Sequence, residues 1–472
     1  MIEGQQVKGE VTHLPSEFVD WLRKPFAQFF RIEAAGGAVL LVFTVAALVL
    51  SNSPWASEFL DFWETRIGLE IGTFEFARSL RDWINDGLMT LFFFLVALEL
   101  KRELVLGELS NSRAAALSIA AALGGMIVPA VFYLALQWGH PASSGWGTVM
   151  ATDTAFVIGC IAILGSRVSH SLRVFMISLA IVDDVGAILV VAIGYSSHIA
   201  WGSLAVAALG VAIIRTLATV GVRTFPIYFL TGALIWLAVD ASGIHATITG
   251  VVLGLLTPAR RWVSDERLYA ILDQVIAYPA TDSGSHATKD RQTLQVAEIA
   301  ARETLSPLER LEIGLHPWVS FVIMPLFAFA NAGLPLSLGE LANSVTVAVF
   351  VGFVLGKPIG VLAFSMLVVR SGLAIRPPGL SWGAIAGGGL LAGIGFTMAL
   401  FIADLAFDEN LLNSAKLGIF AASIVSAIAG VAVLIFAATG GANLLLATSV
   451  QSPAQTDEAL SKDRWSDDGG QN

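Results

Sequence analysis

The chain has 472 residues, of which 56% are hydrophobic and 14% are charged, and its formal net charge is −10. Soluble domains carry charge on about a quarter of their residues, so this composition excludes an ordinary water-soluble protein. Many acids lie in the first external loop and the tail rather than in a patch, so the net charge says little about partners. Nothing indicates a nucleic-acid partner, and membrane lipid is the expected surroundings. The single cysteine, Cys160, lies in an apolar run and cannot form an internal disulfide.

Apolar stretches long enough to cross about 30 Å of hydrocarbon recur along the chain. The first resembles a secretory signal, but it is long for one and further stretches follow, so we expect an uncleaved helix. An all-α polytopic membrane protein with about 12 transmembrane helices is therefore predicted. The expected spans are 34–50, 85–100, 115–138, 148–164, 174–196, 203–221, 226–240, 244–257, 317–335, 345–369, 382–406 and 415–438.

The distribution of basic residues predicts the orientation of these helices, because cytoplasmic loops retain Lys and Arg. With both termini in the cytoplasm, all but five of the 27 Lys and Arg fall on the cytoplasmic side. A missed helix would move every later loop to the other side, so the count and the orientation support each other. The exceptions are Arg66, Arg78, Arg81 and Lys416 outside, and Lys357 within a span.

Polar pieces flank or interrupt the predicted transmembrane domain at residues 34–438. Helices 3–5 and 10–12 are offset by seven spans, an odd number, so the two triplets run in opposite directions and permit an inverted repeat. The polar pieces are an N-terminal cytoplasmic segment (1–33), an external loop (51–84) with a hairpin expected at 68–76, a cytoplasmic loop (258–316) with a flexible stretch at 281–288, and a disordered cytoplasmic tail (439–472).

Two adjacent acids, Asp183 and Asp184, lie near the centre of predicted helix 5, in LAIVDDVGAILVVAIGYS. Placing an ionisable group at this depth in the membrane costs free energy, so its presence indicates a functional site. Neighbours on a helix point about 100° apart, so one carboxylate can face a cation cavity while the other faces another helix. Two like charges about 4 Å apart repel by about 4 kcal/mol at an effective dielectric near 20. Competition between a proton and a cation for such a site is already an exchange mechanism.

Lys357 is the only Lys or Arg in the interior of a predicted span, in FVGFVLGKPIGVLAFSML. A lysine there needs a counter-ion, and a central aspartate of helix 5 is at the right depth. The next residue, Pro358, cannot donate a helical hydrogen bond, so we expect a local bend. A lysine that reaches toward the interface is the alternative interpretation.

Helices 4 and 11 carry features typical of interrupted helices. Helix 4 contains Thr152 and Asp153, and helix 11 contains the glycine-rich GGGLLAGIGFTMALF. Half-helices that end inside a bilayer expose partial charges and free backbone groups that bind ions. Asp153 would offset the positive N-termini and Lys357 the negative C-termini. For the glycines alone, close helix packing explains the pattern equally well.

A second group of ionisable residues lies at the predicted cytoplasmic ends of helices 2 and 9. A histidine among carboxylates titrates near neutral pH and is suited to pH sensing. Ordinary anchoring at the cytoplasmic interface accounts for the basic residues equally well. His245 is left open between helix capping and function. The group consists of Glu99, Lys101, Arg102, Glu103, Glu312 and His316.

At these positions the chain resembles the NhaA family of bacterial sodium/proton antiporters, over roughly residues 20–436. The motifs that carry the resemblance occur in the family's order. They are WINDGLMTLFFFLVALELKREL, ATDTAFVIGCIAILGSRV, LAIVDDVGAI, GIHATITGVVLGLLTP, LHPWVSFVIMPLFAFANAG, GKPIG and GIGFTMALFIADLAF.

The resemblance implies a secondary transporter of the inner membrane, not an enzyme, that needs no cofactor. Na⁺ or Li⁺ would leave in exchange for entering H⁺ by alternating access, electrogenically and under pH regulation. Asp183 and Asp184 would form the transported Na⁺/H⁺ site, supported by Lys357, Thr152 and Asp153, with helices 4 and 11 interrupted. The pH-sensing residues would be Glu99, Arg102, Glu312 and His316, and a homodimer would form through the 51–84 loop.

Three departures from the family pattern are visible. Ile313 stands where a second histidine is frequent, the 258–316 loop is lengthened, and Asp404 is an acid where a small polar residue is usual. Other classes are disfavoured by the same residues. An intramembrane aspartic protease would carry its acids on separate helices, and a retinal protein with a Schiff-base lysine would have seven helices. An ion channel is a further alternative, but an isolated acid pair with a lysine suits a transporter with alternating access better than a pore.

Overall fold

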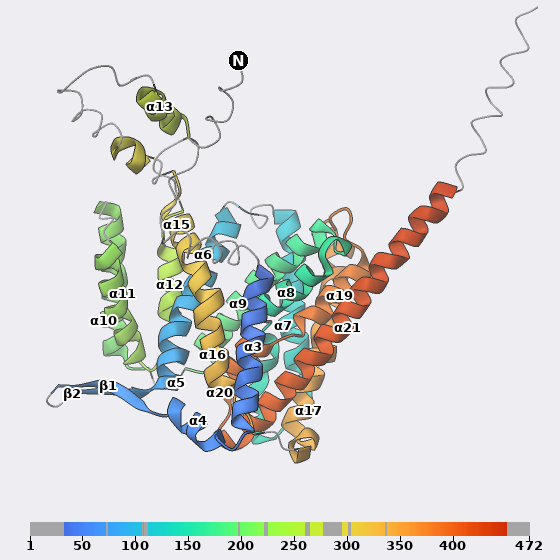
Figure 1. The fold of residues 1–472 in the computed structure, drawn as a ribbon, viewed down its shortest axis with the longest axis horizontal. Coiled ribbons are helices and arrows are strands. Elements are labelled where there is room, and N and C mark those ends of the chain that lie inside the picture. The colour runs from blue at the N-terminus through green and yellow to red at the C-terminus, as the bar shows by residue number, and fades with distance from the viewer. Residues whose placement is uncertain are drawn as a thin grey trace, which may run out of the picture.

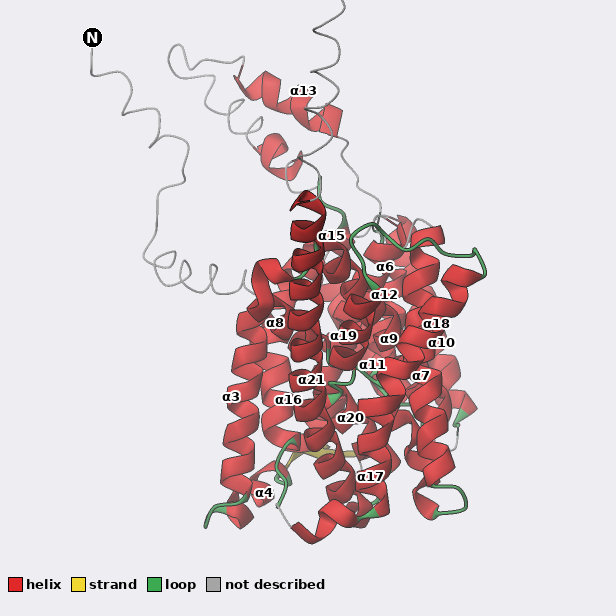
Figure 2. Cartoon of the chain, turned by 90° about the vertical axis from the view of Figure 1, so that its right-hand side faces the viewer, coloured by secondary structure: helices red, strands yellow, loops and turns green. Residues whose placement is uncertain are grey.

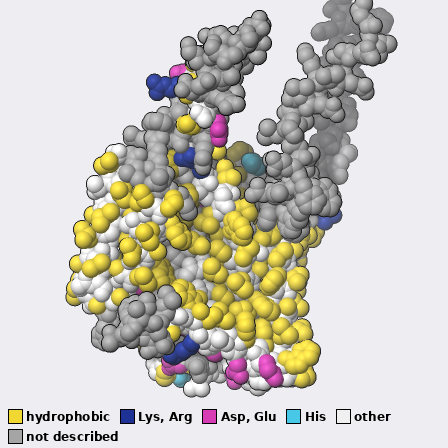
Figure 3. Space-filling view, turned by 60° about the vertical axis from the view of Figure 1, so that its left-hand side comes forward, with side chains coloured by type: hydrophobic (Ala, Val, Ile, Leu, Met, Phe, Trp, Pro, Cys, Tyr) yellow, Lys and Arg dark blue, Asp and Glu magenta, His cyan; other side chains and the backbone are white. Residues whose placement is uncertain are grey.

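The computed structural model describes residues 33–71, 74–105, 107, 112–196, 199–220, 225–259, 265–276, 295–300, 304–335 and 338–450. The predictions made for residues 1–32, 281–288 and 451–472 lie outside the described residues. The described part is a bundle of tilted helices with one two-stranded hairpin at its side (Figure 1). A broad hydrophobic band covers the middle of the bundle, and most charged side chains lie beyond its two ends (Figure 3). Within the described residues, seven helices are long and apolar enough to cross a membrane, or nine if each of two bent pairs is one span. The chain is therefore an all-α, multi-pass membrane protein.

The elements follow one another with short connections through most of the bundle. The first half contains α3 (Glu33–Ser51), α4 (Ala56–Trp63), β1 (Arg66–Ile71), β2 (Phe74–Ser79), α5 (Leu80–Asp82), η1 (Trp83–Leu88), α6 (Met89–Val105), α7 (Ser112–Leu136), η3 (Pro141–Met150), α8 (Thr154–Leu164), η4 (Gly165–Arg167) and α9 (His170–Gly194). The second half contains α10 (Trp201–Val220), α11 (Phe225–Asp240), α12 (Ile248–Leu256), α13 (Asp265–Ile276), α15 (Pro307–Trp318), η5 (Val319–Ile323), α16 (Met324–Asn331), η6 (Leu338–Ala342), α17 (Ser344–Val351), η7 (Gly352–Gly356), α18 (Lys357–Arg370), α19 (Trp382–Ala392), α20 (Phe396–Ala406) and α21 (Glu409–Val450).

Each predicted span coincides with a helix or a helix pair, but not all of these helices are long. The apolar parts of α3 and α11 fall short of 18 residues, and α12 has only nine. The twelve-helix count and the inverted repeat therefore stay predictions.

The two predicted interruptions are present in the structure. Helix η3 meets α8 at an angle of 41°, and α19 meets α20 at 46°. Both breaks are short, at residues 151–153 and 393–395. We call the place where these two breaks meet the crossing.

Polar segments differ from the sequence-based expectation in two places. Helix α15 begins at Pro307, ten residues before the expected span, because Ser306 and Glu309 form a capping box. The expected loop 258–316 also contains α13. Helix α21 continues to Val450, beyond the expected start of the tail at residue 439.

The hairpin expected at 68–76 is confirmed and is slightly longer. Strands β1 and β2 pair antiparallel from Arg66 opposite Ser79 to Ile71 opposite Phe74. Arg78 at its base donates to Asp86 of η1 and to Asp240 of α11, with both Asp240 carboxylate oxygens 2.5 Å from Nη2. Burial alone would lower the pKa of Arg78, but the carboxylates of Asp240 and Asp86 raise it by more, so the pKa lies above its ordinary value. The base of the hairpin is thus fixed to the helices, while strands β1 and β2 extend sideways from the bundle (Figure 1).

Close backbone contact joins α7 to α18. A Cβ on Gly124 would lie 2.2 Å from the carbonyl oxygen of Gly360, and one on Gly360 would lie 2.0 Å from that of Gly124. Small residues allow this approach between membrane helices. The glycines of α19 are also packed, since a Cβ on Gly388 would lie 2.6 Å from Sδ of Met176. The glycines of this segment therefore serve close helix packing as well as lying next to the break.

The α10–α11 pair lies at the edge of the bundle (Figure 1). It has a small core of its own, formed by Ala207, Ile214, Ile235 and Val239, whereas one large core includes α6 to α9 and α16 to α21. Figure 2 shows the same bundle from the side, with α15, α6 and α8 toward one end and α4 and α17 toward the other. We call the end that holds α4 and the hairpin the hairpin end, and the opposite end the α15 end.

Candidate functional site

The crossing is held by hydrogen bonds between the two breaks. The Asp153 N–H donates to the Ile394 carbonyl at 2.7 Å, and the Thr152 hydroxyl donates to the Ala392 carbonyl at 2.9 Å. Residue 392 is the last of α19, so Thr152 satisfies a carbonyl that the broken helix leaves without a helical donor. Two carbonyls at the α19–α20 break are therefore bonded to residues of the η3–α8 break.

Asp153 lies at the N-termini of both second half-helices. Its side chain is 1% exposed, caps α8 through the Phe156 N–H at 3.3 Å, and accepts the Thr397 N–H of α20 at 3.0 Å. The Thr397 hydroxyl also donates to Asp153. Helix N-termini carry partial positive charge, so one carboxylate offsets two half-helix dipoles at once. This is the arrangement that the sequence predicted for Asp153.

Lys357 forms the predicted ion pair with Asp183. Its Nζ lies 2.8 Å from Asp183 Oδ2, and each side chain is 1% exposed. It also donates to the Thr152 hydroxyl at 2.8 Å and to the carbonyl of Met150, the last residue of η3. The lysine thus offsets a half-helix C-terminus as well as a carboxylate. The π-helical turn η7 ends directly before Lys357 and Pro358. The local bend expected at Pro358 stays a prediction.

Asp184 points to a different neighbour. The Thr154 hydroxyl of α8 donates to Asp184 Oδ2 at 3.2 Å, whereas Asp183 faces Lys357 of α18. The separation of the two acids onto different helix faces is confirmed. Asp183, Glu99 and Asp153 all act electrostatically on Asp184, so negative charge accumulates around it. Among the described residues, the only positive side chain in an ion pair with Asp183 or Asp184 is Lys357, which pairs with Asp183.

One oxygen of each acid remains available for a ligand. Asp183 Oδ1 and Asp184 Oδ1 are buried and accept no hydrogen bond from the described residues. Buried carboxylate oxygens are costly unless a proton, a hydrogen-bond donor or a cation satisfies them. Hard cations prefer oxygen ligands of this kind. The geometry suits a site that alternates between a proton and a small cation.

The residues expected to sense pH are only partly brought together. Arg102 of α6 binds Glu312 of α15, and it also lies 3.4 Å from Glu103. Glu99 instead lies within electrostatic range of Asp184. His316 follows Glu312 by one helical turn and is half-buried. The predicted group therefore divides between an α6–α15 ion pair and Glu99, which acts electrostatically on Asp184.

Two threonines of the site were missed by the sequence-based prediction. Thr154 binds Asp184, and Thr397 binds Asp153. Each follows a break by one or two residues, which was a usable signal once the breaks had been predicted. His245, left open before, contacts the Tyr195 carbonyl at 2.9 Å through Nε2 and joins the α11–α12 turn to the end of α9.

Comparison with known proteins extends over nearly the whole chain. A family model described as Na⁺/H⁺ antiporter 1 matches residues 27–434. Na(+)/H(+) antiporter NhaA 2 of Acidiphilium cryptum is 63% identical over 434 residues, which cover 92% of this chain and 97% of the relative. NhaA proteins of Rhizobium meliloti and Rhodopirellula baltica are 58% and 50% identical, over 89% and 90% of this chain and 96% of each relative. The chain therefore belongs to the NhaA family of Na⁺/H⁺ antiporters.

Proposed function

We propose that this chain exports Na⁺, or Li⁺, in exchange for inward H⁺ at Asp183 and Asp184, and that it does so electrogenically by alternating access. The observation that carries the proposal is the pair of buried oxygens, Asp183 Oδ1 and Asp184 Oδ1, at a crossing of two broken helices. The names of the relatives, all Na⁺/H⁺ antiporters, supply the cargo. As a secondary transporter, the chain needs no cofactor.

The exchange follows from competition at one site. A proton and a cation each neutralise the same carboxylate charge, and the low-dielectric surroundings disfavour an arrangement in which neither is bound. Asp184, with which no lysine of the described residues forms an ion pair, is the better cation ligand, with Thr154 as a neighbouring hydroxyl. Asp183 gains or loses Lys357 as its partner during the cycle. The hydrogen bonds of the crossing join two separate pairs of half-helices, so these pairs can shift between the outward-open and inward-open arrangements that alternating access requires.

The proposed orientation places the hairpin end outside the cell and the α15 end in the cytoplasm. The loops after α8 and α18 carry Arg167 and Arg376. Ser171, at the start of α9, donates its hydroxyl to the Pro378 carbonyl at 2.8 Å, which places these loops at the same end of the bundle. Lys101 and Arg102 end α6 near α15. Basic residues gather at the cytoplasmic side of membrane proteins. Both termini would then be cytoplasmic, in the inner membrane.

Two further parts of the proposal concern regulation and assembly. The Arg102–Glu312 pair, with Glu99 and His316, would couple pH to the helices around the central acids. The 51–84 segment would join two copies, because strands β1 and β2 leave their outer edges without a strand partner among the described residues.

The central test is Na⁺-driven proton movement in inverted membrane vesicles with a preformed proton gradient. Asp184→Asn is expected to abolish exchange, whereas Asp61→Asn, the same change at an exposed site on α4, should leave it intact. Imposing an inside-negative potential on proteoliposomes should change the rate, since one net charge gains about 2.3 kcal/mol per 100 mV. Exchange that persists in Asp184→Asn would refute the site. A rate independent of potential would refute electrogenicity.

A further inference from the structure

A second buried polar cluster lies near the hairpin end, at the ends of three helices. The Asn85 amide donates to Asn331 Oδ1 at 3.2 Å and to Asp404 Oδ2 at 3.1 Å. The Asn331 amide donates to Asn85 Oδ1 at 2.7 Å. These residues come from η1, α16 and α20. The cluster therefore brings three oxygen-bearing side chains together from segments far apart in the sequence.

The burial of this cluster shows that its polarity is costly. Asn85 is 6% exposed and Asn331 is 2% exposed, while Asp404 is partly exposed. Nearby Lys416 of α21 is also buried and acts electrostatically on Asp404. Lys357 and Lys416 are the two buried basic residues of the described chain, and each is associated with a buried or half-buried aspartate. A lysine thus accompanies an aspartate at both sites, as a direct ion pair at the centre and at longer range near the hairpin end.

An aromatic layer lies on the inner side of the cluster. Phe401 is 5.5 Å from Phe93 and 6.3 Å from Phe327 between ring centroids, and all three rings are buried. Each ring shares a helix with one cluster residue: Phe401 precedes Asp404 by three positions, Phe327 precedes Asn331 by four, and Phe93 follows Asn85 by eight. Positions three, four or seven to eight apart lie on one helical face. The same three helix faces therefore carry a polar layer and, inside it, an apolar one.

One face of α20 leads from the crossing to the cluster. Thr397, Phe401 and Asp404 follow one another at intervals of four and three residues, so they share a stripe of the helix. Thr397 binds Asp153 at the crossing, and Asp404 binds Asn85 in the cluster. A rise of 1.5 Å per residue separates Thr397 from Asp404 by about 10 Å along the axis. The aromatic layer is the apolar barrier between the two polar sites on this stripe.

We propose that Asn85, Asn331 and Asp404 form a second cation site, the external port, which takes a partly dehydrated alkali cation on the outer side of the aromatic layer. The proposal rests on the proposed function, because it places the port on the route between the central acids and the external solution. The ligands are a carboxylate and two amide oxygens, which suit a hard monovalent cation. Rotation of an Asn side chain by 180° exchanges its amide donor for its oxygen, so the cluster can turn from mutual bonding to ion binding.

The test compares the two faces of the membrane. Right-side-out vesicles expose the external port to added Na⁺, and inverted vesicles expose the cytoplasmic face. Asp404→Asn keeps the size and hydrogen bonding of the side chain but removes the charged ligand. We expect the Na⁺ concentration for half-maximal exchange to rise on the order of tenfold at the external face, as expected for losing one interaction with a charge. The value at the cytoplasmic face should stay at that of the wild type. Asp404→Glu should remain near the wild type at both faces.

The controls separate a port from a merely structural network. Asp408→Asn makes the same charge change four residues away at an exposed position, and should alter neither face. Asn331→Ser, which removes one amide ligand and leaves Asp404 in place, should give a smaller external shift and serves if Asp404→Asn does not fold. Equal shifts at both faces, or no shift in a folded variant, would overturn the port. Absence of exchange in the wild type would overturn the proposed function instead.

Discussion

Two ion pairs join distant helices of this molecule, and they differ in burial. The Lys357–Asp183 side chains are each 1% exposed, whereas Arg102 is 40% exposed and its partner Glu312 is 9% exposed. Taking two charges out of water costs several kcal/mol per ion, so a fully buried pair is poor evidence for stability and better evidence for function. A half-exposed pair breaks and reforms at little cost. The central pair therefore suits a transport site, and the α6–α15 pair suits regulation.

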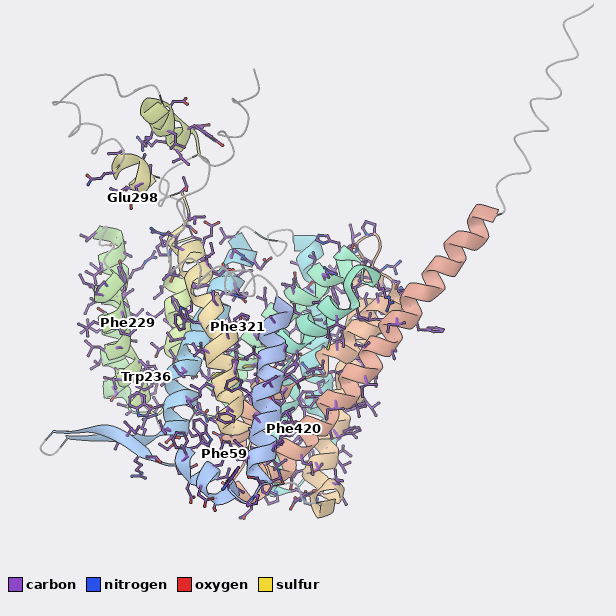
Figure 4. All side chains as sticks on the ribbon, in the orientation of Figure 1. Phe59, Phe229, Trp236, Glu298, Phe321 and Phe420 are labelled. Atoms are coloured by element: carbon purple, nitrogen blue, oxygen red, sulfur yellow. The ribbon has the colours of Figure 1, made fainter. Side chains whose placement is uncertain are left out.

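A third ion-pair group lies between these extremes. Arg78 and its partners Asp86 and Asp240 each have side chains 21–23% exposed. Arg78 also lies over the Trp236 ring, 5.8 Å from its centroid, and Trp236 in turn donates to the Thr90 hydroxyl at 2.9 Å. Figure 4 marks Trp236 near the hairpin end of α11. The three groups form a series in which the cost of losing the basic side chain should follow its burial.

The largest effect is expected for Lys357→Met. This change leaves Asp183 as a buried carboxylate without its counter-ion, and it also removes the donor to Thr152 and Met150. Breaking a buried pair by removing one partner costs about 3–5 kcal/mol of unfolding free energy. Thermal unfolding in detergent should therefore shift to clearly lower temperature.

The double variant Asp183→Asn with Lys357→Met is the matched control. It removes both charges, so most of the lost stability should return, while Na⁺/H⁺ exchange should remain defective. A single variant as stable as the wild type would contradict the buried pair. Lost stability that the double variant does not recover would show that the bonds to Thr152 and Met150, not Asp183, are what Lys357 contributes.

An intermediate effect is expected for Arg78→Gln. The change removes ionic hydrogen bonds to Asp86 and Asp240, which are worth about 1.5–3 kcal/mol each before solvent exposure is taken into account. The loss should be local, so backbone amides of β1 and β2 should exchange with deuterium faster. Arg66→Gln, at an exposed position of the same hairpin, should leave exchange unchanged. If both variants behave alike, Arg78 does not anchor the hairpin.

The central pair was predictable, because Lys357 is the basic residue that lies deepest within a predicted span and a buried charge allows few solutions. The breaks in helices 4 and 11 were also predictable, from Asp153 in an apolar run and from the glycines near residue 393. Hydropathy failed at Pro307, since the first turns of α15 are polar. The capping signal Ser306 to Glu309 was present but was outweighed by composition.

Contacts between remote segments were not predictable from one sequence. Thr397 and Asp153 lie 244 positions apart, and Asn85 and Asp404 lie 319 apart. No local periodicity links such residues, because their meeting depends on how the helices pack. Asp404 was visible as an isolated acid, but its partners became apparent only from the ends of η1 and α16.

The smallest effect on stability, and the one that most sharpens the comparison, is expected for Glu312→Gln. Glutamine can still accept a hydrogen bond, and Arg102 is exposed enough to be hydrated, so the free energy of unfolding should change by about 1 kcal/mol or less. The pH profile of exchange should flatten nonetheless, because a group whose protonation breaks the α6–α15 link has been removed. Glu298→Gln, an exposed glutamate outside the bundle (Figure 4), should leave the profile unchanged. A large loss of stability with an unaltered pH profile would reverse the assignment, since Arg102–Glu312 would then hold the fold rather than regulate it.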